Sequence, residues 1–233
     1  MMETFSGFGP GFFGFFRDLG ENNSREWFQA NKARYEADVV TPLMAFIAAM
    51  QPRLKAVSPH FLAEPKKQGG SMFRIHRDVR FSRDKRPYKE HGACQFRHEA
   101  GGGRDVHAPG YYVHLEPGGV RFGGGIWLPP SDMLAAIRTR IDRLPKEWEA
   151  VIGDAALVKA FGGVAGDGLS RPPKGFSADH RHVEDLKRKT FFVMQRAEEN
   201  DAARADFPDR VAAAFGAASP LMRFLCEAGG VAF

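Results

Sequence analysis

The chain has 233 residues, of which 43% are hydrophobic and 26% are charged, as in ordinary globular domains. This composition excludes a wholly disordered chain, a collagen-like repeat and a disulfide-rich scaffold. The formal net charge is +5, a modest positive excess whose placement along the chain matters more than its sum.

The first 60 residues are predicted to be helical. Residues 12–19 have the pattern of a short helix that ends at Gly20. Ser24 is a candidate N-cap of a second helix, and Pro42 suits the first turn of a third. A loop rich in proline and glycine then ends this helical part.

Residues 70–130 are predicted to form a sheet. Four short runs rich in β-forming residues are separated by glycine and proline, and they cover residues 72–81, 93–98, 110–116 and 120–128. The sequence EPGGV at 116–120 predicts a hairpin turn, and GGGRD at 101–105 predicts a loop. Because these connections are too short for helical crossovers, we expect the sheet to be antiparallel.

Residues 131–233 are predicted to be mainly helical again. Ser131 is a candidate N-cap of a helix over residues 132–143. Further helices are expected at 145–152, 155–161, 207–215 and 221–227, and one more strand at 189–195. The pattern predicts one α+β domain over residues 1–233, an antiparallel β-sheet flanked by N-terminal and C-terminal helices.

The cysteine content and the hydropathy pattern indicate where in the cell the protein is expected. The two cysteines, Cys94 and Cys226, lie far apart and outside any CxxC pair, so we expect no structural zinc site. A reducing, cytoplasmic location is the expectation that follows. The Phe-rich start lacks the basic region of a signal peptide, and no apolar stretch is long enough to cross a membrane, so we expect no membrane partner.

The positive charge is concentrated in residues 66–91. This basic segment holds nine Lys and Arg residues and three acids, a net charge of +6, whereas the rest of the chain sums to −1. Such a cluster attracts phosphate, carboxylate or nucleic acid. In a strand over 72–81, Arg77 points to the same side as Phe73, Ile75 and Val79, so we expect it to need a carboxylate, several carbonyls or an anion.

This segment carries a family resemblance. The pattern Arg74-x-x-Arg77-Asp78-x-Arg80-Phe81-x-x-Asp84-Lys85-x-x-Tyr88-Lys89 resembles the signature of an uncharacterised, mainly bacterial family, known only as a domain of unknown function. Members of that family are similar in length to this chain. Further matches extend over nearly the whole chain, at Asn22-Asn23, Trp27-Phe28, Pro109 to Tyr112, His114, Gly125 to Trp127, and Pro173 to Phe176. The resemblance implies a single domain with a site built from these motifs, and it brings no established activity.

A first hypothesis for this segment is a binding or enzymatic site for a small anion. Arginine captures phosphate or carboxylate through two parallel hydrogen bonds and lysine adds a point charge, which suits a clamp of Arg77, Arg80, Lys85 and Lys89. The full set of candidate ligand-binding residues is Arg74, Arg77, Arg80, Lys85, Tyr88, Lys89 and Lys174.

Proton transfer in such a site has three candidates: Asp78, Tyr88 and His114. His114 is preferred because it shares a strand face with Tyr112. Asp78 lies beside arginines and is expected to stay ionised, which suits a base poorly. These candidates leave open whether the protein is an enzyme.

Two alternative functions stay open as well. The protein could bind nucleic acid through the basic segment, where Phe81 and Tyr88 would offer stacking surfaces. Or it could be a structural or partner-binding module, in which Arg77 and Arg80 only pair with Asp78, Asp84 or Glu116. The sequence leaves the oligomeric state undetermined.

Metal and cofactor sites are not expected. Four histidines, namely His76, His91, His107 and His114, lie in or near the predicted sheet, but no HxH or HExxH spacing supports a metal site. The glycine-rich stretches lack the pattern of a phosphate-binding loop. The loop around Lys174 would either cover the site as a lid or be an ordinary surface loop.

Overall fold

The fold is built on one meandering antiparallel sheet. A computed structural model describes residues 4–101 and 108–233, so His107 and most of the loop expected at 101–105 lie outside the described residues. The five strands follow the order β1-β2-β3-β4-β5. Their bounds are β1 (Phe61–Leu62), β2 (Gly92–His98), β3 (Gly110–Glu116), β4 (Gly119–Ile126) and β5 (Phe191–Ala197). The predicted α+β class, an antiparallel sheet with helices before and after it, is confirmed.

Helices precede and follow the sheet. Those before it are α1 (Pro10–Glu21), α2 (Arg25–Ala30), α3 (Lys32–Tyr35), the π-helical turn η1 (Glu36–Val40) and α4 (Thr41–Val57). The 3-10 turn η2 (Glu99–Gly101) follows β2. The later helices are α5 (Ser131–Arg143), α6 (Pro145–Ile152), α7 (Ala155–Phe161), α8 (Val183–Leu186), α9 (Glu199–Ala202), α10 (Phe207–Ala217) and α11 (Ser219–Ala228). In the described part of the chain no single helix could span a membrane by length and hydropathy, although α10 and α11 together, bent by 55°, pass that test.

The residues that precede α2 and α5 decide whether each helix begins with a side-chain cap. The Ser24 hydroxyl accepts a hydrogen bond from the Trp27 amide at 3.2 Å and caps α2, as the sequence predicts. The N-cap predicted at Ser131 is wrong, because Ser131 is the first residue of α5 and Pro130 precedes it in an extended conformation. The Pro130 side chain has no acceptor for a helix amide, so this helix begins without a side-chain cap.

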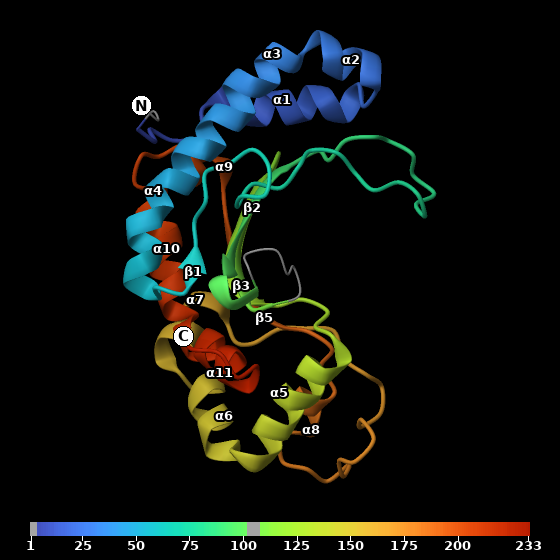
Figure 1. The fold of residues 1–233 in the computed structure, drawn as a ribbon, viewed down its shortest axis with the longest axis vertical. Helices are drawn as coiled ribbons and strands as arrows, with labels where there is room; N and C mark the ends of the chain where they lie inside the picture. The colour runs from blue at the N-terminus through green and yellow to red at the C-terminus, as the bar shows by residue number, and fades with distance from the viewer. Residues whose placement is uncertain (1–3, 102–107) are drawn as a thin grey trace.

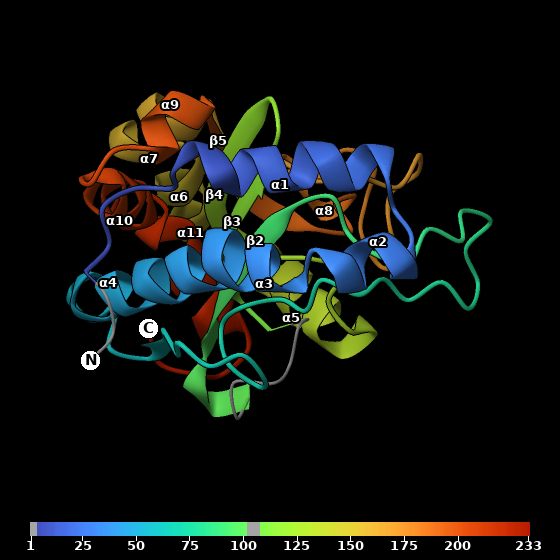
Figure 2. The same ribbon diagram turned by 90° about the horizontal axis from the view of Figure 1, so that it is seen from above.

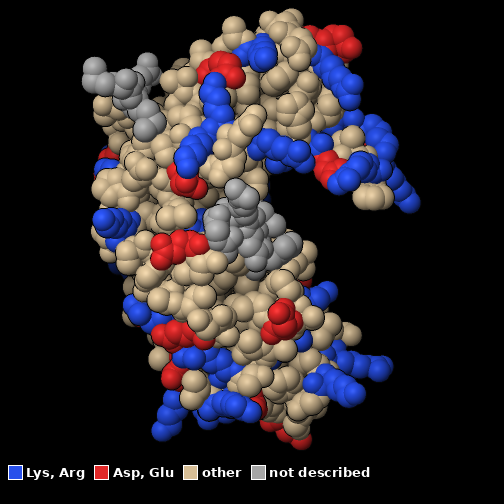
Figure 3. Space-filling model, viewed as in Figure 1, with Lys and Arg blue, Asp and Glu red and all other residues tan. Residues whose placement is uncertain are grey.

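The two faces of the sheet have different surroundings. One face packs against α4, α10 and α11, where Tyr111 stacks on Phe215 at 4.4 Å between ring centroids and Phe122 meets Phe207 at 5.7 Å. The other face looks onto a hollow, so that the chain outlines a letter C (Figures 1 and 3). Helices α1–α3 form the upper limb of the C, and α5, α6 and α8 form the lower limb. We call the hollow the cleft.

Residues 74–90 form an irregular hairpin that extends from the upper limb, which we call the arm (Figures 1 and 2). Backbone hydrogen bonds from Arg77 to Pro87 (2.9 Å) and from Lys89 to Ile75 (2.8 Å) join its two sides. The strand predicted at 72–81 is therefore wrong, since only isolated bridges form in this stretch and Phe81 is 95% exposed. Pro87 has no amide hydrogen to extend the ladder, and no helix or strand of the described residues packs on the end of the arm (Figure 1).

Candidate functional site

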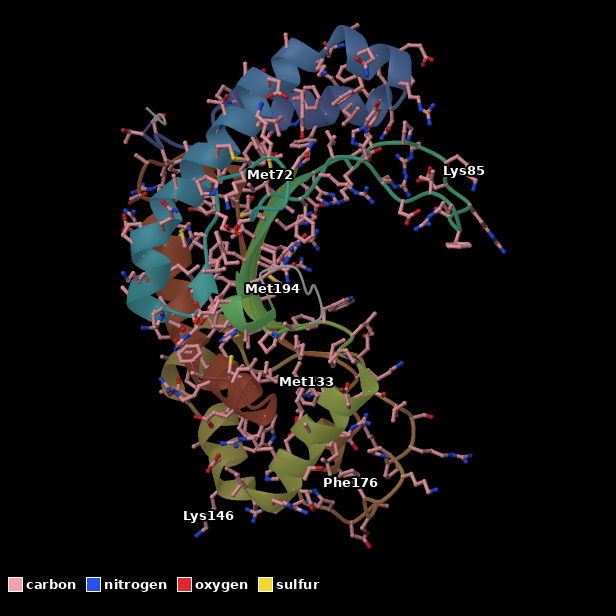
Figure 4. The ribbon with its side chains drawn as sticks, in the orientation of Figure 1. Met72, Lys85, Met133, Lys146, Phe176 and Met194 are labelled. Carbon is pink, nitrogen blue, oxygen red and sulfur yellow. The ribbon has the colours of Figure 1, made fainter. Side chains whose placement is uncertain are left out.

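The face of the sheet toward the cleft carries polar and aromatic side chains at alternate positions. In β3, Tyr111, Val113 and Leu115 are buried in the core, so Tyr112, His114 and Glu116 project from the opposite face. Figure 4 shows Met194 of β5 on this same side, between the Lys85 end of the arm and the loop around Phe176.

An apolar pocket of about 420 Å³ opens on this face, a volume typical of small-molecule sites. Its lining combines aromatic and aliphatic groups with bare backbone: Phe73, Gln95, Ala108, Gly110, Tyr112, Gly124, Gly125, Ile126, Trp127, Phe192 and Met194. Gly125 has φ of +151°, and a Cβ atom there would lie 2.2 Å from the Phe191 carbonyl oxygen. Only glycine therefore allows β4 to run so close to β5 under the pocket.

A chain of hydrogen bonds runs along β3 beside this pocket. The Tyr112 hydroxyl lies 3.0 Å from His114 Nδ1, and His114 Nε2 lies 3.0 Å from Glu116 Oε2. Arg121 of β4 pairs with the other oxygen of Glu116. The Glu116 carboxylate can only accept a hydrogen bond from Nε2, whereas the Arg121 guanidinium, 3.4 Å from the same nitrogen, can only donate one. Both tautomers of His114 therefore find partners here, and Nδ1 either accepts from the Tyr112 hydroxyl or donates to it.

Burial and hydrogen bonding determine the charge states of Tyr112, His114 and Glu116. Burial lowers the pKa of His114, and the hydrogen bond to Glu116 offsets this only in part. For Glu116, burial alone would raise the pKa, but the hydrogen bond from His114 and the charge of Arg121 outweigh it and leave the pKa lowered. Burial raises the pKa of Tyr112 to about 12. At neutral pH this hydrogen-bonded series therefore consists of a neutral phenol, a neutral imidazole and a carboxylate.

His91 and Lys89 lie beside these hydrogen-bonded side chains, on the side of the arm. The His91 ring lies 4.2 Å from the His114 ring, and burial, reinforced by His114, lowers the pKa of His91 to about 4. Lys89 Nζ donates to the Arg74 carbonyl at 3.0 Å and lies 5.2 Å from the centre of the Phe73 ring. Burial, and next the charge of Arg74, lower the pKa of Lys89. Among residues 4–101 and 108–233, no carboxylate forms an ion pair with Lys89.

Two of the predicted anion ligands, Arg77 and Arg80, have partners within the arm. Arg77 donates to Asp84 Oδ2 at 2.8 Å and to the Arg86 carbonyl at 3.1 Å, a carboxylate and a carbonyl of the kind expected for it. Arg80 pairs with Asp78, and this hydrogen bond lowers the pKa of Asp78 to about 2. Arg80 is thus paired with a carboxylate of its own, whereas Arg77 shares Asp84 with Arg86.

A comparison with family models gives a match over residues 11–224 to a family described as Conserved hypothetical protein (DUF2461). The chain belongs to this family. The membership predicted from the sequence, in a family of unknown function, is thereby confirmed. No curated protein and no solved structure matches the chain.

Some motif residues of this DUF2461 chain hold the arm rather than face the cleft. Tyr88 is 3% exposed and stacks on Phe28, and its backbone amide and carbonyl both bond to the Asn23 side chain, at 3.1 and 3.0 Å. The structure thus places Tyr88 in the core, away from any ligand in the cleft. Lys85 donates to the Val79 carbonyl at 2.9 Å near the end of the arm.

The other candidates are also dispersed. Lys174 is exposed. It belongs to the loop that contains Phe176, which Figure 4 shows on the lower limb, across the cleft from Lys85. That loop is tied to the lower helices through Arg181 with Glu149 and through His180 with Asp142 (3.4 Å). The structure therefore places Lys89 beside Arg74 and, through His91, near His114. No hydrogen bond, ion pair or ring contact joins Lys174, Asp78 or the Tyr88 side chain to this group within the described part of the chain.

Sequence reasoning missed Glu116 as the partner of His114 and assigned it to the arm arginines instead. The signal was present in YYVHLE at 111–116, where Tyr112, His114 and Glu116 recur at every second position. Pocket residues such as Phe192 and Met194 come from a distant strand and give no such local signal. Within the described ranges, no group of three or more His, Cys, Asp or Glu side chains has the arrangement of a metal site.

Proposed function

We propose that this protein binds a small organic anion in the cleft, with the apolar part of the ligand in the pocket and its negative group at Lys89. The observation that carries the proposal is the position of this ammonium group. It is partly buried, it has no ion-pair partner in the described part of the chain, and it borders an apolar pocket. An ammonium group held in this way is destabilised until an anion joins it.

The Phe73 ring connects the charge to the pocket. Lys89 Nζ lies over this ring, and the same ring lines the pocket and lies 6.0 Å from the Tyr112 ring. A phosphate or carboxylate at Lys89 would therefore place an attached planar or aliphatic group against Phe73 and Tyr112. Arg77 and Arg80 contribute only their field in this arrangement, because carboxylates of the arm already bind them.

The test is a thermal-shift screen of the whole chain, followed by calorimetry on any hit. The panel holds inorganic phosphate, phenyl phosphate, benzoate, sugar phosphates, nucleotides, and di- and tricarboxylates, each at low and high salt. A ligand at 100 times its Kd adds about 2.7 kcal/mol, which raises Tm by about 5–10 °C at this chain length. Lys89→Met should abolish the shift, while Lys146→Met, an exposed substitution on α6, should retain it. A shift that persists in Lys89→Met would refute this placement of the anion.

Nucleic-acid binding by the arm is a second candidate, favoured by one observation. Phe81 is 95% exposed at the end of the arm, with the Arg80 guanidinium 5.8 Å from its ring centre. An exposed ring among cations is the arrangement on which single-stranded bases stack. Fluorescence anisotropy with a labelled oligonucleotide would show binding that weakens steeply with salt and is lost in Phe81→Ala. Absence of binding at low salt would remove this candidate.

A further inference from the structure

We infer that the ligand of the pocket is a flat aromatic anion with a hydrogen-bond acceptor on its ring, and that Gln95 selects this ligand through that acceptor. The inference deepens the proposed function and rests on it for the anionic group alone. Three features of the pocket carry it: a floor of bare backbone, aromatic rings on two sides of that floor, and one side-chain amide directed over it.

The floor of the pocket is glycine backbone. Gly110 of β3 and Gly125 of β4 are partners in the register of the sheet, and the backbone of Gly124 also lines the pocket. Gly110 lies two residues before Tyr112, so it shares the strand face that looks onto the cleft. Because Gly110 and Gly125 have no side chains, a flat group can lie directly on the backbone at this point.

Two pairs of aromatic rings flank this floor. The Phe73 and Tyr112 rings lie 6.0 Å apart with 71° between their planes, and the Trp127 and Phe192 rings lie 5.5 Å apart with 51° between theirs. Strand β4 runs between β3 and β5, and Gly125 lies opposite Phe192, so the floor lies between the two pairs. Such rings favour an aromatic partner over a saturated one of equal size, because ring edges and faces attract each other.

Gln95 supplies a hydrogen-bond donor over the floor. Arg97 Nε donates to Gln95 Oε1 at 3.2 Å, and because a guanidinium group can only donate, this contact turns the amide oxygen toward Arg97. The amide nitrogen then lies over Gly110, where an added Cβ atom would be 3.1 Å from Gln95 Nε2. In the described part of the chain no acceptor binds this nitrogen, so it can donate to a carbonyl oxygen or ring nitrogen of the ligand.

The Phe73 ring connects this amide to the cation of the proposed function. The Arg97 guanidinium carbon lies 5.7 Å from the centre of that ring, and Lys89 Nζ lies 5.2 Å from it. The acceptor of the ligand therefore meets Gln95, and its anionic group meets Lys89, at the border of one and the same ring. This arrangement suits a compact heteroaromatic carboxylate or phosphate.

Two pairs of matched probes test the shape of the pocket. Benzoate and cyclohexanecarboxylate carry the same charge on a flat and a puckered ring, and benzamide and cyclohexanecarboxamide repeat the comparison without charge. NMR titration of the full chain gives a Kd for each probe. In both pairs the flat member should bind about 5-fold more tightly, the size of an aromatic contact.

The uncharged pair keeps this inference apart from the proposed function. If neither acid binds while benzamide binds more tightly than cyclohexanecarboxamide, the preference for a flat ring is supported and only the anion site at Lys89 is refuted. Equal Kd values within both pairs, or no binding of any of the four probes, would overturn the inference.

Gln95 is tested with probes that differ by one ring atom. At neutral pH at least one of the three pyridinecarboxylates should bind about 5-fold more tightly than benzoate, because its ring nitrogen accepts a hydrogen bond from the amide. Gln95→Leu should remove this difference. Gln29→Leu, the same substitution at an exposed position of α2, should retain it. A difference that persists in Gln95→Leu, or no difference in the wild type, would refute selection by Gln95.

A measurement on the wild type needs no substitution. Met194 lines the pocket on the cleft side (Figure 4), whereas Met222 is fully buried below Gly124 on the core side. In protein with isotope-labelled methionine methyl groups, saturating benzoate should shift the Met194 signal through its ring current, and cyclohexanecarboxylate should shift it much less. The Met222 signal should stay in place. Equal shifts of Met194 with the two acids would overturn the inference even if Gln95→Leu fails to fold.

Discussion

The Tyr88 ring lies on the Phe28 ring with 4.2 Å between centroids and 21° between planes, which joins the returning side of the arm to α2. Tyr88 is 3% exposed, whereas the other aromatic residue of the arm, Phe81, is 95% exposed. Two rings in one short hairpin therefore have opposite environments. This contrast offers a matched pair of substitutions.

Tyr88→Ala should lower the free energy of unfolding by about 3–5 kcal/mol, because it leaves a cavity where a large buried ring packs. Phe81→Ala should change it by less than about 0.5 kcal/mol, as for an ordinary surface position. Urea unfolding followed by circular dichroism measures both. Equal effects would show that the arm packs differently from the arrangement described.

Substitutions of Arg77 and Arg80 test whether the ion pairs within the arm stabilise the fold. The Arg77 side chain is 26% exposed and binds both a carboxylate and a carbonyl, so Arg77→Ala should cost about 1–2 kcal/mol of unfolding free energy. Arg80 is 77% exposed, and Arg80→Ala should leave stability unchanged within error. If Arg77→Ala unfolds at the same urea concentration as the wild type, the network is not a source of stability.

Stability should fall as the pH drops from about 7 to 4, in part through His91. Its folded-state pKa of about 4 lies below the ordinary value of 6.5, so the unfolded chain binds the proton more tightly. The stabilising contribution is complete above the unfolded pKa and is lost as the pH falls toward the folded one. Its size is about 1–2 kcal/mol, discounted because the ring stays partly in contact with solvent.

His91→Gln should flatten that part of the profile of unfolding free energy against pH. His114, Lys89, Glu116 and Arg121 also act on this ring, and all four remain in the variant, so the difference between the two profiles reports the loss of His91 and of its coupling to them. Parallel profiles for the wild type and the variant would show that His91 titrates normally.

Gly125→Ala should be strongly destabilising. The new Cβ atom would meet the Phe191 carbonyl at 2.2 Å, at a φ of +151° that other residues rarely adopt, and such strain costs about 1–3 kcal/mol before the clash is counted. Gly119→Ala in the same strand meets nothing within 4 Å and should be close to neutral. Differential scanning calorimetry of both variants would decide, and a neutral Gly125→Ala would contradict the close approach of β4 and β5.

The regular elements were predictable because their signals are local. Strand β3 matches its predicted residues, and helices α6 and α7 begin and end where the pattern places them. Strand β5 begins two residues later than predicted, at Phe191. In β3, buried residues alternate along the strand, and in α6 the buried residues Trp148 and Val151 lie one helical turn apart.

The arm was not predictable in this way. Its alternation of charged and apolar residues has the period of a strand, but the chain leaves the sheet after Phe73 and finds no second neighbour. Alternation shows which side chains share a face, and it does not show whether another element covers that face. The pairing of His114 with Glu116 depends on the same local spacing, yet the pocket beside it depends on β5, which pairs with β4 from far along the chain.

The arm also bears on how the chain would respond to a protease. Trypsin cuts after Lys and Arg, and the exposed end of the arm offers Arg80, Arg83 and Lys85, while the bond after Arg86 is protected by Pro87. A nick there would separate β1 from β2 in sequence, yet the two strands would stay paired, and α4 would stay packed on α10. Limited digestion should therefore yield two fragments that elute together under native conditions and separate only in denaturant.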